Sequence, residues 1–486
     1  PNLSIGIIPL MKVELLNAKA DEVKMSVAIF VFEDEEISAR LKESTLKKIK
    51  EIASFERFKA KESAILKLNI EEYGTVYLCG LGKRESFNLD KLRRASAALI
   101  KSIKRVGPKE VAIDAFEKDS DSVRAIVEGA QLGLYSFEEY KTKGENNSPD
   151  RILILSNDEK AFNLGILFAK AQLFARDLAN QPPNIINPVS LAERALALSR
   201  ELGLECEVFD EKELEKMGMN ALLSVGKGSD TPPRLVHITY RPQNPKDKIA
   251  IVGKALTFDS GGLNIKTGDY MRGMKYDKSG ACAVLGVVKA LPELAPNVEV
   301  HAIFAAAENM PSGKAYRPDD IIKTKNGKYI EIDNTDAEGR VTLADALSFA
   351  CELGISKLID LATLTGACMV ALGEYTAGLF SNDIELSTLL KEASKFTGER
   401  LWELPLDDEK LREKIKRCDA DVVNSGGRYG GAITAAMFLQ EFVKEGVKWA
   451  HLDIAGPANM REDWGYYSKG ATGFGTRTLL ELIRRL

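Results

Sequence analysis

Two kinds of hydrophobic pattern alternate along the first third of the chain. Short apolar runs typical of buried strands lie at 25–32, 75–79, 110–113 and 152–155. Residues 89–103 and 122–134 instead repeat apolar positions every three to four residues, as amphipathic helices do. Strands that alternate with helices indicate an α/β fold. We therefore predict a smaller N-terminal α/β domain over residues 1–155.

A long helical pattern follows and leads into a second region of alternating elements. The pattern runs from about Glu159 to Leu178 and stops before Pro182 and Pro183, which cannot continue a helix. We interpret 156–178 as a helical linker. The strands predicted beyond it are 235–240, 249–252, 299–305, 329–332, 358–361 and 449–454. The predicted helices are 281–290, 343–352, 384–396 and 432–445. Residues 179–486 thus read as a larger α/β domain with a mainly parallel central sheet flanked by helices.

Polar and glycine-rich segments follow five of these predicted strands. They contain Lys254 and Asp259, Glu308 and Asn309, Asp336 to Arg340, Thr363 to Gly366, and Gly456 with Pro457. Open α/β sheets bind ligands at the carboxyl ends of their strands. We therefore expect these five segments to form one site rather than separate solvated loops.

The stretch Asn334-Thr335-Asp336-Ala337-Glu338-Gly339-Arg340 carries two carboxylates one residue apart. Such a pair repels itself unless protons or cations neutralise it. Asp259 and Asp277 bring the number of candidate carboxylates to four. Oxygen ligands of this kind suit hard divalent cations, and shared carboxylates can bridge two metals about 3.5–4 Å apart.

Two lysines and an arginine accompany the carboxylates. Lys254 and Lys266 can divide two roles between them, one as a metal ligand and one as a donor to a developing oxyanion. Arg340 never loses its proton in a protein but can hold a small planar anion through two parallel hydrogen bonds. Residue chemistry alone favours a two-metal hydrolase and leaves phosphoester and amide substrates both open.

Other hydrolase chemistries fit the sequence less well. Of the three histidines, His237 and His301 lie within apolar strand patterns, which favours packed core residues over ligands or bases, and His451 lies in the predicted strand 449–454. Ser260 precedes two glycines but does not form a GxSxG elbow. HExxH is absent, which argues against a single-zinc protease.

Composition and charge place the chain among ordinary globular proteins. The 486 residues carry a net charge of -4, so no overall attraction to nucleic acid or anionic lipid is expected. The six cysteines are scattered without a CxxC pair, as in a reducing compartment. No signal-peptide pattern opens the sequence, and no apolar run is long enough for a membrane span. We expect a cytoplasmic protein without membrane contact.

Seven ordered motifs resemble those of the cytosolic, binuclear-metal leucyl aminopeptidases. They are residues 252–262, 274–277, 308–313, 334–340, 362–367, 430–436 and 470–475. The resemblance is strong over roughly 175–486 and weak before it. It implies a homohexamer in which each subunit has a smaller N-terminal α/β domain and a catalytic domain.

The resemblance also implies roles for single residues. One metal ion is expected on Lys254, Asp259, Asp277 and Glu338, and a second on Asp259, Asp336 and Glu338. Lys266 corresponds to the catalytic lysine that polarises the scissile carbonyl, and Arg340 to the arginine that holds a bicarbonate acting as general base. Zinc or manganese is expected, with magnesium or cobalt accepted at the looser site. Lys278 stands where an apolar residue is expected, and its charge is expected to weaken metal binding.

The expected substrates are peptides with a free N-terminus, whose α-amine binds a metal ion so that only chain ends react. A pocket for an apolar side chain such as leucine is expected around Met274, Asn334, Thr363, Gly366 and Ala455. The expected role is intracellular peptide turnover.

An alternative function is that of a DNA-binding accessory factor on the same fold, as in some bacterial relatives. Its support is confined to the basic stretches 47–50, 91–94 and 101–105. Such stretches are more often the solvated face of a helix.

Overall fold

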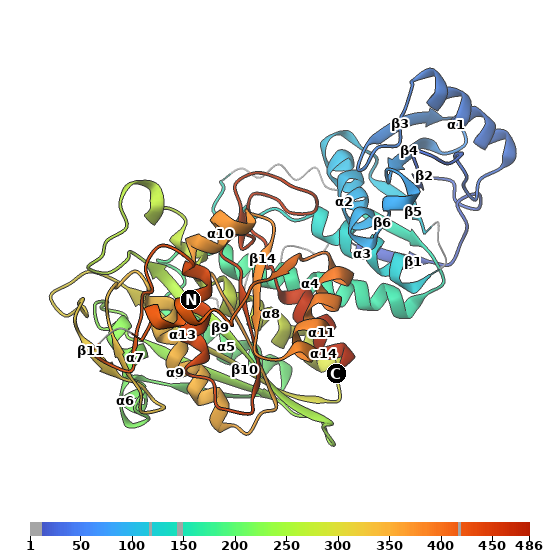
Figure 1. Ribbon diagram of the computed structural model, residues 1–486. Coiled ribbons are helices and arrows are strands. Elements are labelled where there is room, and N and C mark those ends of the chain that lie inside the picture. The colour runs from blue at the N-terminus through green and yellow to red at the C-terminus, as the bar shows by residue number, and fades with distance from the viewer. Residues whose placement is uncertain (1–11, 116–118, 143–148, 417–418) are drawn as a thin grey trace. The chain divides into compact units, whose positions relative to one another are not determined.

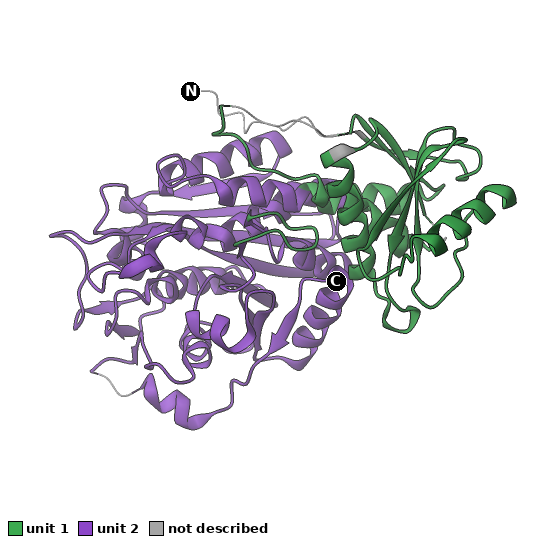
Figure 2. Cartoon of the chain, turned by 90° about the horizontal axis from the view of Figure 1, so that it is seen from above, with its two compact units in different colours: residues 1–170, 461–469 green, residues 171–460, 470–486 purple. Residues whose placement is uncertain are grey.

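The structure is a computed structural model that describes residues 12–115, 119–142, 149–416 and 419–486. The chain divides into two compact units (Figure 2). Unit 1 comprises residues 1–170 and 461–469, and unit 2 comprises residues 171–460 and 470–486. Both units are α/β structures, which confirms the predicted fold class.

Unit 1 is built on a six-stranded sheet in the order β1-β6-β5-β2-β4-β3. All strand pairs are parallel except β3 with β4. The strands are β1 (Lys12–Leu16), β2 (Ser26–Val31), β3 (Ile65–Ile70), β4 (Gly74–Gly80), β5 (Glu110–Asp114) and β6 (Arg151–Leu155). The helices are α1 (Glu43–Phe55), α2 (Leu89–Val106), α3 (Ser120–Gly133) and the start of α4 (Glu159–Asn180), with a short turn η1 (Arg84–Ser86).

The central strands of unit 1 are buried on both faces. Ala28 and Phe30 of β2 pack with α2 and α3, whereas Val27 and Ile29 pack on the opposite face with α1. Because both faces are covered, these strands read as continuous apolar runs and were predictable. Edge strand β3 alternates apolar with exposed polar residues, β1 mixes polar with apolar residues, and α1 is rich in lysine and glutamate, so the sequence did not reveal them.

Unit 2 contains an eight-stranded sheet in the order β15-β14-β17-β13-β9-β10-β8-β7 (Figure 1). The adjacent strands β17, β13, β9 and β10 are mutually parallel, so their carboxyl ends lie at the same edge. The strands are β7 (Glu205–Phe209), β8 (Arg234–Tyr240), β9 (Asp247–Asp259), β10 (Val298–Asn309), β13 (Lys357–Ala362), β14 (Ala377–Ser381), β15 (Leu401–Glu403) and β17 (Lys448–Asp453).

Helices cover both faces of this sheet. On one face lie α5 (Pro188–Leu202) and α8 (Ser279–Leu294), with α14 (Thr476–Arg485) packed on α8 and α11 (Ile384–Thr397) on α14. On the other lie α7 (Asn220–Gly226) and α9 (Glu338–Glu352), with α13 (Gly431–Gln440) packed on α9. The remaining helices and turns are α6 (Glu211–Lys216), α10 (Gly366–Leu372), α12 (Glu409–Lys414), η2 (Gly268–Met271) and η3 (Met274–Lys278).

Several details differ from the sequence prediction. The predicted strand 299–305 continues to Asn309, so Glu308 and Asn309 lie within β10 rather than after it. The predicted strand 329–332 is not part of the central sheet: β12 (Tyr329–Glu331) belongs to a small sheet with β11 (Ile321–Lys323) and β16 (Val422–Val423). Only the middle residue of β12 is buried, unlike the strands at the centre of the eight-stranded sheet, which are buried along most of their length. The predicted strand 249–252 continues to Asp259, so Lys254 and Asp259 lie within β9 rather than after it. The last pair of strands, β18 (Asn459–Met460) and β19 (Gly470–Ala471), forms a separate two-stranded sheet.

Glycines allow α8 to lie directly against the central sheet. A Cβ at Gly280, in the first turn of α8, would lie 2.3 Å from the carbonyl oxygen of Leu361 on β13 and 2.8 Å from the nitrogen of Lys254 on β9. A Cβ at Gly253 would meet the nitrogen of Ala281 at 2.5 Å. This backbone approach brings η3, which immediately precedes α8, next to β9.

The Gly280→Ala variant is therefore expected to lower the free energy of unfolding by about 1–3 kcal/mol, the usual range for overpacking a tight core. Urea denaturation of the metal-free protein measures this change. Gly313→Ala is the matched control, since a Cβ there meets no atom within 4 Å. Equal stability of the two variants would show that α8 does not need the close contact.

Candidate metal centre and active site

Side chains from several elements converge at the carboxyl ends of the central strands. Lys254 and Asp259 come from β9, and Lys266 from the loop after it. Asp277 comes from η3, Asp336 precedes α9, and Glu338 is the first residue of α9. Oxygens of Asp259, Asp336 and Glu338 all lie within 4.8 Å of one another. The structure thus brings together all the carboxylates and lysines singled out in the sequence.

Each lysine forms ion pairs with two of the four carboxylates. Lys254 Nζ lies 2.8 Å from Asp277 Oδ2 and 2.9 Å from Glu338 Oε1. Lys266 Nζ lies 2.8 Å from Asp259 Oδ2 and also pairs with Asp336 Oδ1. Two ammonium groups cannot balance four ionised carboxylates, so the cluster has an excess of negative charge.

The pKa values of the cluster reflect this crowding. Burial, with the neighbouring charge of Asp259, raises the pKa of Glu338 to about 8. Burial also raises the pKa of Asp277 and of Asp336, against the opposing effect of the lysines. For Lys254, burial works to lower the pKa, but Asp277, Glu338 and Asp259 raise it above its ordinary value. The carboxylates therefore resist full ionisation unless further positive charge is supplied.

This donor set fits a binuclear metal centre. Glu338 Oε2 is buried and, among the described residues, has no hydrogen-bond donor. It faces a group of carboxylate oxygens close enough to share a cation. Hard divalent cations take oxygen ligands at about 2–2.6 Å and would neutralise the excess charge.

Arg340 lies in the first turn of α9 and is almost completely buried. Its Nε has no hydrogen-bond acceptor in the described part of the chain. Burial lowers its pKa to about 10, although Glu338 and Asp453 favour the charged form. Arg340 is therefore a cation at neutral pH, with hydrogen-bonding capacity left for an anion.

Buried amides hold the carboxylate segments in place. Asn309 Nδ2 donates to Asp259 Oδ1 at 2.8 Å and to the carbonyl of Thr335 at 2.9 Å, linking β9 to the loop before α9. Asn424 Oδ1 accepts from the backbone nitrogens of Asp333 and Asn334 at 2.9 and 3.2 Å. The sequence drew attention to Asn309 but gave no local signal for Asn424, which follows β16 some ninety residues along the chain.

Lys278 does not bind the carboxylate cluster. Its buried Nζ donates to the carbonyls of Ala179, Gln181 and Lys275 at 3.1, 2.9 and 2.5 Å. Lys275 Nζ donates to the carbonyl of Asn180 at 2.9 Å. The two lysines thus satisfy carbonyls at the end of α4 and fix η3, which carries Asp277, to that helix end.

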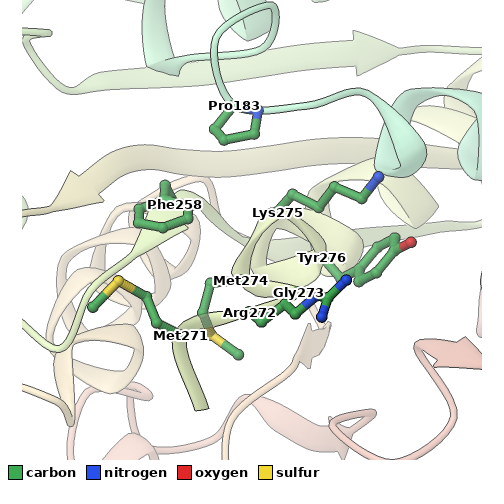
Figure 3. A pocket seen from close by; sticks show the side chains of 8 residues that line it. All are labelled: Pro183, Phe258, Met271, Arg272, Gly273, Met274, Lys275 and Tyr276. Carbon is green, nitrogen blue, oxygen red and sulfur yellow. The ribbon is translucent and has the colours of Figure 1, made fainter. Parts of the chain in front are cut away.

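Met274 lines a cavity of about 560 Å³ in unit 2 (Figure 3). The other residues that line it are Pro183, Phe258, Met271, Arg272, Gly273, Lys275 and Tyr276. Phe258 directly precedes Asp259, and Tyr276 directly precedes Asp277. The side chains of Met271, Met274 and Phe258 give this cavity an apolar wall close in sequence to two of the carboxylates (Figure 3).

The other four residues of the predicted pocket do not line this cavity, and two of them contact the cluster directly or through the backbone. Asn334 Oδ1 accepts from the backbone nitrogen of Asp336 at 2.8 Å. Thr363 Oγ1 donates to Asp277 Oδ1 at 2.7 Å, and its carbonyl accepts from Lys254 Nζ at 3.0 Å. Gly366 begins α10 after β13, and Ala455 follows β17. Both therefore lie at the same sheet edge as the carboxylates.

The basic stretches that suggested DNA binding are partly occupied by local contacts. Arg93 is buried with its Nε 2.6 Å from Glu128. Arg94 pairs with Glu62 at 2.5 Å and Asp90 at 3.0 Å, and Lys101 donates to the carbonyl of Tyr467 at 3.0 Å. These side chains support the helix surface of unit 1 and do not form a free cationic face.

The fold and the carboxylate cluster define a metal-dependent hydrolase of the α/β class. Two family models match the chain: the catalytic domain of the cytosol aminopeptidase family over residues 173–480, and the N-terminal domain of that family over residues 28–144. The chain belongs to the cytosol aminopeptidase family and is a metal-dependent aminopeptidase.

Individual relatives agree with this assignment. A probable cytosol aminopeptidase of Aquifex aeolicus is 58% identical over 98% of this chain and 99% of its own length. Among solved structures, a tomato leucine aminopeptidase mutant is 34% identical with a TM-score of 0.88, covering 98% of this chain and 97% of its own. The bottromycin maturation enzyme BotP in complex with Mn is 35% identical with a TM-score of 0.87, covering 95% and 99%.

None of the helices in the described ranges combines the length and the hydropathy required to span a lipid bilayer.

Gly339 provides a test of the position of Lys254. A Cβ at Gly339 would lie 2.4 Å from Lys254 Cε and 2.7 Å from its Nζ. Gly339→Ala should therefore push the amine away from Asp277 and Glu338 and weaken metal binding by about 10- to 100-fold, the range typical of disturbed metal-site geometry. Metal titration of the stripped protein measures this loss, with Gly313→Ala as the control. Unchanged affinity in Gly339→Ala would contradict a role for Lys254 at the metal centre.

Proposed function

We propose that this aminopeptidase releases apolar N-terminal residues, leucine among them, from peptides by two-metal hydrolysis. The observation that supports this proposal is the cluster of four carboxylates, three of them buried, with excess negative charge and with Lys266 and Arg340 beside it. A solved tomato relative is named a leucine aminopeptidase, which favours leucine as a substrate residue.

The proposed ligands form two overlapping sets. Lys254, Asp259, Asp277 and Glu338 would hold one ion, and Asp259, Asp336 and Glu338 the other, with Asp259 and Glu338 shared. The mutual distances within the carboxylate group support this division. Bound divalent ions would lower the pKa of water and polarise a carbonyl. Zinc or manganese is proposed, with magnesium or cobalt accepted at the looser site, and the Mn complex of BotP supports manganese.

Lys266 and Arg340 are proposed as the catalytic side chains. The ammonium of Lys266 stays charged because Asp259, Glu338 and Asp336 raise its pKa although burial opposes them. It can therefore donate a hydrogen bond to the carbonyl oxygen of the scissile peptide as negative charge develops there. Arg340, whose Nε has no acceptor among the described residues, would hold a bicarbonate, and this small anion would accept the proton of the attacking water.

The proposed metal centre would also favour substrates with a free N-terminus. A neutral α-amine could bind a metal ion through its lone pair, whereas the nitrogen lone pair of an N-acylated chain end is delocalised into the neighbouring carbonyl group. The P1 side chain would enter a pocket formed by Met274, Asn334, Thr363, Gly366 and Ala455, of which Met274 also lines the cavity beside Phe258 and Met271.

The family relationship also supports a proposal for the cellular role of the enzyme. We propose intracellular peptide turnover in the cytoplasm by a homohexamer, in line with relatives named cytosol aminopeptidases. The DNA-binding alternative receives no support from the relatives, and several of its basic residues are already paired with acidic neighbours.

The experiment compares leucine release from a free-amine peptide and from its N-acetylated twin. Metal-stripped enzyme is expected to be inactive, and zinc or manganese is expected to restore cleavage of the free-amine peptide alone. Asp336→Asn, which removes one charge from the cluster, is expected to reduce kcat/KM at least 100-fold, in line with the loss of a metal ligand.

Asp333→Asn is the matched control, because Asp333 is an exposed carboxylate four residues before the N-cap of α9 and outside the cluster. Its activity should stay close to that of the wild type. Equal cleavage of the free and acetylated peptides would contradict the proposed exopeptidase specificity and indicate a different two-metal hydrolase.

A further inference from the structure

A buried carboxylate outside the metal cluster connects two of the loops at the active-site edge. Asp453 is the last residue of β17 and is fully buried. Its Oδ1 accepts from the backbone nitrogens of Leu364, Thr365 and Ala455 at 3.3, 3.4 and 3.2 Å. Its Oδ2 accepts from Thr365 Oγ1 at 2.6 Å. One side chain therefore joins the loop after β13 to the loop after β17.

Because Asp453 is fully buried, its carboxylate needs these hydrogen bonds. Within the described residues it forms no ion pair, and a buried carboxylate without hydrogen bonds would carry a large desolvation penalty. The donors from Leu364, Thr365 and Ala455 supply the compensation. Charge-assisted bonds of this type are stronger than neutral ones, so the backbone of both loops is held firmly to one point.

The residues held by Asp453 adjoin the proposed substrate pocket. Leu364 follows Thr363, Thr365 precedes Gly366, and Ala455 is itself a proposed pocket residue. Thr365 Oγ1 also accepts from the backbone nitrogen of Cys368 at 3.0 Å, so the same hydroxyl caps the N-terminus of α10. The position of three of the five proposed pocket residues thus depends on this carboxylate.

Asp453 does not act on the metal ligands in the same direct way. Its carboxylate contacts backbone nitrogens and a threonine hydroxyl, and none of the proposed ligand side chains. The link to the cluster is indirect and runs through Thr363, which donates to Asp277. Loss of the Asp453 contacts is thus expected to change the shape of the pocket more than the metal centre.

We propose that Asp453, through Thr365, is a positioning residue that sets the side-chain specificity of the enzyme. This inference rests on the proposed function, since it takes Thr363, Gly366 and Ala455 as walls of the substrate pocket. Removal of the Thr365 hydroxyl or of the Asp453 charge would release the two loops from one another. The pocket would then discriminate less between a large apolar side chain and a small one.

The test measures kcat/KM for peptides with N-terminal leucine and N-terminal alanine, together with the bound metal content. The ratio of the two values is expected to fall at least tenfold in Asp453→Asn and in Thr365→Val, with the metal content of the wild type. Thr365→Ser keeps the hydroxyl and should keep the ratio within twofold of the wild type. Asp383→Ala, which removes the N-cap of α11, controls for the loss of a helix cap as such.

Several results would overturn the inference. One is a leucine-to-alanine kcat/KM ratio in Thr365→Val within twofold of the wild type. Another is a fall of this ratio in Thr365→Ser as large as that in Thr365→Val. A third is a variant that loses bound metal together with the ratio. If Asp453→Asn does not fold, the Thr365 pair decides alone. Failure of the proposed function is recognised separately, because the wild-type enzyme would then cleave neither free-amine peptide.

Discussion

Electrostatic repulsion among four clustered carboxylates, three of them buried, is the constraint on which this structure depends. Asp259, Asp277, Asp336 and Glu338 come from three segments of the chain, and no fold would hold them together without compensation. Lys254 and Lys266 supply part of it. The negative charge that the lysines leave uncompensated creates an affinity for divalent cations. The same repulsion that opposes assembly of the site therefore also gives the site its metal chemistry.

Several features of unit 2 hold the four carboxylates together against this repulsion. Parallel strands β9, β10, β13 and β17 place their carboxyl ends at one edge, and glycine contacts let α8 approach β9 closely. Buried amides such as Asn309 and Asn424 then fix the segments that carry the acids. Asp453 secures the neighbouring loops in the same way, by converting a buried charge into hydrogen bonds with the backbone.

The sequence predicted the doubly buried strands and the carboxylate segments because both have local patterns. Continuous apolar runs revealed β2 and β10, and the spacing of Asp336 and Glu338 indicated metal chemistry. Edge strands β1 and β3 and the separate sheet containing β12 were not predicted, since partly exposed strands lack such runs. The contacts of Asn424, Lys278 and Asp453 depend on residues distant in sequence, which no local pattern encodes.

We propose that cations shared by Asp259 and Glu338 balance the charge of the cluster. Titration of zinc into the metal-stripped protein by calorimetry tests it most directly. We expect the wild type to bind about two zinc ions per chain, as other two-metal sites do. We expect no tight zinc binding in Asp259→Asn, because both ions lose a shared ligand. A single ion in the wild type, or two tightly bound ions in Asp259→Asn, would contradict it.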